Sequence, residues 1–108
     1  MEIQIDEKQQ RELTILKQRN PKVHQEVSTL LRSIYRKLER ATTKEDVPPI
    51  LVAAETKLGQ IFQLSKNSID RADYLKVDSI ILGICQQAMG QLRFRDLPPK
   101  TRGTPSNG

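Results

Sequence analysis

Basic side chains are the residues of this sequence best placed to do chemistry, and the chemistry they favour is anion binding. Arg32, Arg36 and Arg40 recur at every fourth position beside Lys37, so a helix would present them as one cationic stripe. Between positions 22 and 40 five cations stand against two anions, a local charge of +3. Such a stripe can contact phosphates, although the commoner interpretation is a solvated helix face.

A second basic group, also with a local charge of +3, lies near the C-terminus. Its members are Arg93, Phe94, Arg95, Lys100 and Arg102, with Asp96 as the one anion. Cations at a helix C-terminus complement the helix dipole, which explains the first two arginines without any function. The exposed aromatic residue between these two arginines favours a binding role as well. It indicates a basic arm that reaches a partner at a membrane surface.

The remaining reactive side chains do not form a catalytic or metal-binding pattern. The single histidine, His24, and the single cysteine, Cys85, lie far apart and without ligand spacing, so we expect no metal. Cys85 falls in an apolar stripe, where a cysteine packs as a small hydrophobe. The clustered acids at 70, 73 and 78 are typical of a helix start and do not indicate a catalytic site. The glycines at 83 and 90 follow no predicted strand, so they do not form a nucleotide-binding loop. We expect neither an enzyme nor a cofactor.

Length and composition limit the architecture that can carry these groups. The chain has 108 residues, enough for one domain, with 36% hydrophobic and 4% aromatic residues and no Trp. The net charge of +5 favours an anionic partner without identifying it. The charged first fifteen residues lack a signal-peptide core, and the longest apolar run, 50–54, is far short of the roughly 20 residues of a membrane span. We therefore expect a cytoplasmic protein with no membrane-spanning segment.

Apolar spacing predicts four helices, over about 6–19, 21–40, 48–64 and 70–92, with Asn20-Pro21 separating the first two. The second helix should bury Val23, Val27, Leu30, Leu31, Ile34 and Leu38. The third should bury Leu51, Ala54, Leu58, Ile61 and Phe62, with Gly59 permitting the close approach of a neighbour. The fourth should bury Tyr74, Val77, Ile81, Ile84, Cys85, Ala88 and Leu92. Residues 41–49, which end in two prolines, are expected to connect the second helix to the third.

The start of the fourth helix carries a specific local signal. Asp70 is expected to be its N-cap, with Asp73 in the first turn and Ile69 packed on Tyr74 as a hydrophobic staple. The fold class is therefore all-α, an antiparallel four-helix bundle over residues 1–95. Residues 96–108, with three prolines and two glycines, are expected to form a flexible C-terminal tail.

Two segments carry a resemblance to a known family. Residues 33–40 (SIYRKLER) and 45–51 (EDVPPIL) resemble the immunity proteins of class IIa (pediocin-like) bacteriocins, especially the enterocin A immunity type. The resemblance covers roughly residues 10–95 in the order of elements. It departs in the third helix, where Phe62 is the sole aromatic residue, and in the proline-rich tail.

This resemblance implies a cytoplasmic four-helix bundle that protects a bacterium from a bacteriocin. Its partner would be the mannose phosphotransferase permease with bound bacteriocin, met at the inner face of the membrane, with no small-molecule substrate. The C-terminal half would set which bacteriocin is countered, which here means the fourth helix and the arm from Arg93 to Arg102. From their charge and spacing, and not from the resemblance, we expect Arg32, Arg36 and Arg40 to add a lateral charged patch.

Two other hypotheses stay open. A small basic helical regulator could bind DNA or another protein, although no helix-turn-helix turn is evident, so nucleic acid is the less favoured partner. A structural subunit could use exposed Ile80 and Leu82 as a homodimer face.

Overall fold

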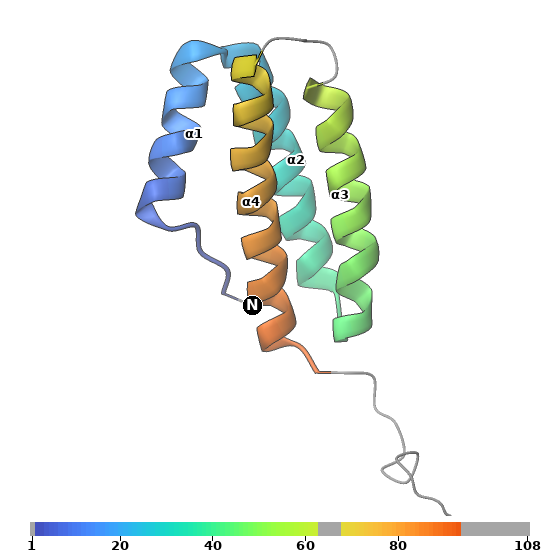
Figure 1. The fold of residues 1–108 in the computed structure, drawn as a ribbon. Coiled ribbons are helices and arrows are strands. Elements are labelled where there is room, and N and C mark those ends of the chain that lie inside the picture. The colour runs from blue at the N-terminus through green and yellow to red at the C-terminus, as the bar shows by residue number, and fades with distance from the viewer. Residues whose placement is uncertain (1, 63–67, 94–108) are drawn as a thin grey trace, which may run out of the picture.

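Four α-helices and one short 3-10 turn make up the described part of the chain. The computed structural model describes residues 2–62 and 68–93. In chain order the elements are α1 (Glu7–Arg19), α2 (Pro21–Arg40), η1 (Lys44–Asp46), α3 (Val47–Phe62) and α4 (Ser68–Gln91). Successive helices run in opposite directions, and α1 and α3 each pack against both α2 and α4 (Figure 1). The predicted all-α antiparallel four-helix bundle is confirmed.

The first two helices are positioned by side-chain caps. The Asp6 carboxylate accepts a hydrogen bond from the Gln9 backbone N–H at 2.7 Å, and the Gln9 side chain accepts one from the Asp6 N–H, which completes a capping box. Asn20 ends α1 and also caps α2, because its side chain accepts from the Val23 N–H at 3.3 Å. Pro21 occupies the first position of α2, where its missing N–H costs nothing. The chain thus reverses direction at Asn20, between α1 and α2, where the sequence predicted that one helix ends and the next begins.

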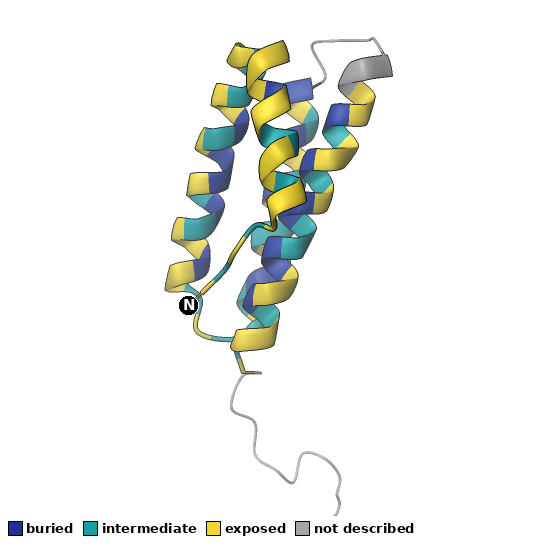
Figure 2. Ribbon diagram, turned by 90° about the vertical axis from the view of Figure 1, so that its left-hand side faces the viewer, coloured by how far each residue is buried: buried dark blue, intermediate teal, exposed yellow. Residues whose placement is uncertain are grey.

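The core is built mainly from the inward faces of α2, α3 and α4, with Leu16 added from α1 (Figure 2). The expected faces are buried almost throughout, with Val23, Leu51, Tyr74 and Leu92 only half-buried at the margins. Val47 is fully buried, although the sequence placed it in the connection. Among residues 2–62 and 68–93, no helix is both long and apolar enough to span a bilayer.

The proposed homodimer face on α4 is wrong. Ile80 is 1% exposed and Leu82 is half-buried, so neither side chain is free to form such a face. The reason is that α4 packs against α1, α2 and α3, so its buried surface is wider than the single stripe that the spacing indicated.

Two local predictions on α3 and α4 are also wrong. Helix α4 begins at Ser68, two residues before the expected N-cap Asp70. Acids are favoured throughout a first turn, so Asp70 marks the start of the helix without defining its first residue. The side chains of Ile69 and Asp70, and with them the predicted staple, lie outside the described residues. Among the residues that the structure describes, no neighbour lies within 4 Å of where a Gly59 side chain would begin, so the expected close approach is not found there.

An extended N-terminal segment, which the sequence did not predict, lies along α4 (Figure 1). The Gln91 and Gln87 side chains accept hydrogen bonds from the backbone N–H groups of Glu2 and Gln4 at 2.9 and 3.0 Å. The same two amides donate to the carbonyls of those residues. The spacing of Gln87 and Gln91 on the helix matches the spacing of Glu2 and Gln4 on the extended segment. Four residues of helix rise about 6 Å, and two residues of extended chain span about 6.6 Å. This pairing holds Ile3 and Ile5 against the core.

Candidate functional site

The solvent side of α2 carries the predicted cationic stripe. Arg32, Arg36, Lys37 and Arg40 are all exposed, and together we call them the α2 cationic face. Across the residues that the structure describes, no hydrogen bond or ion pair engages any of these four side chains. The face therefore keeps its full positive charge available for an anionic partner.

Two hollows lie beside the α2 cationic face. The smaller, about 320 Å3, is lined by Arg32 and Arg36 together with the hydroxyl-bearing Thr29 and Ser33. The larger, about 550 Å3, lies between α2 and α3, and we call it the α2–α3 groove. It is lined by Gln25, Glu26, Thr29, Leu30, Ser33, Ile34, Lys37, Ile50, Ala53, Ala54, Lys57 and Ile61.

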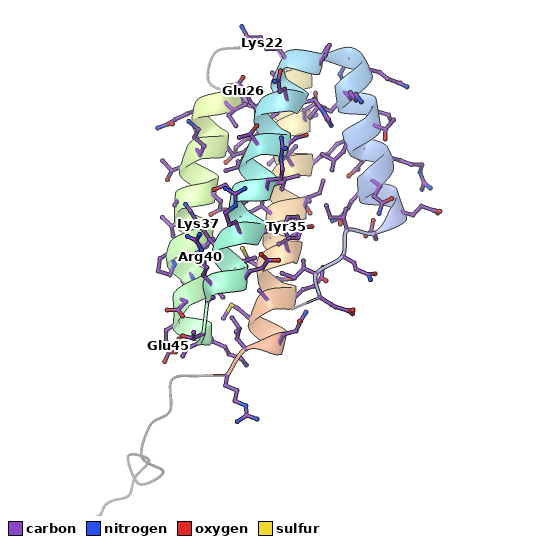
Figure 3. The ribbon with its side chains drawn as sticks, turned by 180° about the vertical axis from the view of Figure 1, so that it is seen from behind. Lys22, Glu26, Tyr35, Lys37, Arg40 and Glu45 are labelled. Atoms are coloured by element: carbon purple, nitrogen blue, oxygen red, sulfur yellow. The ribbon has the colours of Figure 1, made fainter. Side chains whose placement is uncertain are left out.

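Figure 3 shows how the charged residues are distributed along α2. Lys37 and Arg40 lie toward the C-terminal end on the side that faces α3, whereas Tyr35 lies on the opposite side of the helix. Lys22 and Glu26 lie toward the N-terminal end. Three of the four members of the α2 cationic face thus lie in the last two turns of α2, at the end of the bundle where α3 begins.

The second basic group is described only at its first member. Arg93 is exposed, and its carbonyl accepts a hydrogen bond from the Lys44 backbone N–H at 2.7 Å. This contact, with a bridge between Thr43 and Arg93, ties the end of α4 to the link between α2 and α3. Because α2 and α4 run in the same direction, Arg40 and Arg93 lie at the same end of the bundle (Figure 1). The other candidate residues, Phe94, Arg95, Lys100 and Arg102, lie outside the described residues.

The link between α2 and α3 is stiffened by one carboxylate. Asp46 accepts hydrogen bonds from the backbone N–H groups of Thr42 and Thr43 at 2.9 and 3.0 Å. These bonds favour the ionised form and hold the pKa of Asp46 below its usual value. The link therefore has a defined shape against which Arg93 is placed.

Two residues that could do chemistry are engaged in packing. Cys85 is buried in the core as expected, and burial raises the pKa of its thiol. His24 is half-buried in the first turn of α2, where burial and then the charge of Lys17 lower its pKa. Residues 2–62 and 68–93 contain no group of three His, Cys, Asp or Glu side chains able to hold a metal ion.

The structure reveals an ion pair that sequence reasoning missed. Asp73 of α4 is only 5% exposed, and it accepts a hydrogen bond from the guanidinium of Arg19 at the end of α1. The sequence explained Asp73 by the helix dipole alone. Because the two residues are 54 positions apart, no local pattern could have paired them.

A carboxyl pair between α3 and α4 was also missed. The pKa of Glu55 is raised, first by a hydrogen bond with Asp78, then by burial and by the charge of Asp78. The second oxygen of Asp78, Oδ1, is buried without a hydrogen-bond partner. Glu55 therefore holds its proton more strongly in the folded protein than in the unfolded chain.

Replacing Glu55 with Gln is expected to stabilise the protein at neutral pH by about 1 kcal/mol, the net worth of one hydrogen bond. The raised pKa means that the stabilisation by the Glu55 proton is complete below the unfolded-state pKa and is lost as the pH rises through the folded-state pKa. An amide donates to Asp78 at every pH, so the advantage of E55Q should grow as the pH rises through the raised pKa of Glu55 and should persist at neutral pH. Urea unfolding at several pH values measures it, with E39Q at an exposed site as the control. An equal advantage for E55Q at all pH values would contradict the shared proton.

No protein-family model, curated protein or solved structure matches this chain. The structure by itself defines the class as an all-α bundle with an exposed cationic helix face that has no acidic partner among residues 2–62 and 68–93.

Proposed function

We propose that this chain is a non-enzymatic binding protein that docks on an anionic partner through the α2 cationic face. The observation that carries the proposal is that Arg32, Arg36, Lys37 and Arg40 are exposed together without a partner in the described residues. Charges that are not needed inside the fold cost stability through mutual repulsion, and they steer a complementary surface into contact.

The particular role we propose is immunity to a pediocin-like bacteriocin. Support comes from the position of the two segments that resemble those immunity proteins. Residues 33–40 supply three of the four cations of the face, and residues 45–51 contain the start of α3 at the same end of the bundle. The partner would be the bacteriocin-bound mannose phosphotransferase permease, reached from the cytoplasm.

A membrane location would assist this docking. Each cation near an anionic lipid surface contributes about 1 kcal/mol of attraction, so four exposed cations could recruit the bundle without inserting it. Recruitment of this kind places the α2 cationic face toward the membrane complex.

The alternative is a regulator that binds DNA or another protein, and the hollow between Arg32 and Arg36 is the observation that favours it. Guanidinium groups recognise phosphates, and the affinity for a duplex would fall steeply as salt is added. Retention of a DNA duplex at low salt, with no protection against any bacteriocin, would select this alternative.

Expression in a bacteriocin-sensitive strain, followed by challenge with a panel of pediocin-like peptides, tests the proposal. We expect protection against one or a few peptides, and we expect R32E/R36E/R40E to lose it by at least about tenfold in tolerated peptide concentration. The exposed cations Lys8, Arg71 and Lys76 on α1 and α4 provide a control, because K8E/R71E/K76E changes the net charge equally. Full protection by the α2 variant, or equal loss in the control, would contradict the assigned face.

A further inference from the structure

The α2–α3 groove has an apolar floor that follows both helices. Leu30 and Ile34 contribute from α2, and Ile50, Ala54 and Ile61 contribute from α3. The lining extends from Gln25 to Lys37 along α2, and twelve residues of helix rise about 18 Å, or just over three turns. The groove is therefore long enough to hold three turns of another helix.

Small side chains keep this groove open. Ser33, Ala53 and Ala54 lie at its middle, where larger residues would fill the space between the two helices. Helix α1 lies on the other side of α2, so no helix of the described residues covers the groove (Figure 3). A helix approaching from solvent could place its own apolar side chains between α2 and α3.

The charges along the groove favour an acidic occupant. Lys37 on α2 and Lys57 on α3 line its two sides, and Arg40 lies one turn beyond Lys37. The lining contains one acid, Glu26, which lies toward the N-terminal end of α2 (Figure 3), the end of the groove nearer to Lys57 than to Lys37 because α3 is antiparallel to α2. An occupant with acidic flanks would therefore meet cations on both sides of the groove.

We propose that the α2–α3 groove binds an amphipathic helix of a partner protein, with apolar residues facing the floor and Asp or Glu residues beside Lys37 and Lys57. Apolar anchors at i, i+4, i+7 and i+11 would match three turns of groove. A second copy of this chain suits the site less well, because its net charge is +5. The proposal rests on the binding role given above, but it does not depend on bacteriocin immunity.

Synthetic helical peptides of about 15 residues test the site. One carries leucines at i, i+4, i+7 and i+11 flanked by glutamates, and its companion has lysines in place of the glutamates. With isotopically labelled full-length protein, we expect the acidic peptide to shift the amide signals of Thr29, Ser33, Ala53 and Lys57. The basic peptide should bind at least about tenfold more weakly.

Matched variants assign the binding to the two groove lysines. We expect K37E/K57E to weaken binding of the acidic peptide by about tenfold or more, whereas K8E/K76E changes net charge equally and should stay within about twofold. Circular dichroism checks that both variants remain folded. Equal binding of the two peptides, signal shifts on α1 and α4, or an equal loss in the control variant would overturn the proposal.

Anionic vesicles provide the competing outcome. If phosphatidylglycerol vesicles bind the protein through the same lysines while the acidic peptide does not, the groove rim is a lipid contact and the proposal is wrong. Loss of cell protection in R32E/R36E/R40E with unchanged peptide binding would separate the α2 cationic face from the groove. If the unmodified protein protects no bacteriocin-sensitive cells, the immunity role is wrong, and binding of the acidic peptide still tests the groove.

Discussion

Replacing Leu58 with Ala is expected to lower the free energy of unfolding by about 3 to 4 kcal/mol. Leu58 lies in the middle of α3 and is fully buried, so its truncation removes apolar contacts and leaves a cavity among helices that cannot close completely. Domains of this size have a total stability of about 5 to 15 kcal/mol, so the loss would be a large fraction of the whole. Urea denaturation followed by circular dichroism measures the change.

Leu75 on α4 provides the matched control for this truncation. The chemical change Leu to Ala is identical, but Leu75 is 59% exposed, so L75A should cost less than about 0.5 kcal/mol. If L58A and L75A destabilise the protein equally, Leu58 is not a core residue and the packing of α3 described above is wrong.

Replacing Arg19 with Met is expected to lower the free energy of unfolding by about 2 to 3 kcal/mol. The substitution keeps most of the side-chain volume but removes the cation that faces Asp73, leaving a carboxylate that is 5% exposed without its charged partner. The guanidinium is itself partly exposed, which allows water to replace some of the lost interaction and keeps the cost at this level. Chemical denaturation of the variant at neutral pH gives the value.

A double-mutant cycle identifies the cause. Adding D73L to R19M removes the buried charge as well, so the double variant should recover most of the lost stability. The exposed pair of Arg11 and Glu7, joined at 3.3 Å on α1, is the control, and R11M should cost less than about 0.5 kcal/mol. A double variant less stable than R19M would show that the ion pair is not the reason for the loss.

Most of the fold was predictable because its signals are local. Asn20-Pro21 separates two helices through a cap and a fixed proline angle, and the spacing of Val27, Ile34 and Leu38 assigns one face of α2 to the core. The wrong predictions concern residues that lie outside the single apolar stripe recognised on each helix. Val47 and Ile80 are buried because other helices cover them, which their own neighbours in sequence do not indicate.

The candidate site was also predictable only in part. The four-residue spacing of Arg32, Arg36 and Arg40 predicted a shared face, and the structure places all three exposed on α2. The spacing could not show that Lys37 lies across a groove from Lys57, because the two residues belong to different helices. Nor could the spacing distinguish these cations, which pair with no acid in the described part of the chain, from Arg19, which pairs with Asp73.

The sequence by itself determined the helices, the faces they bury and the position of the cationic stripe on α2, because helix periodicity and capping act over only a few residues. The tertiary structure alone decided which faces meet. It paired Arg19 with Asp73, placed Glu55 against Asp78, held the N-terminal segment on Gln87 and Gln91, and opened a groove beside Lys37. These contacts depend on how helices distant in the sequence pack, which no short stretch of the chain specifies.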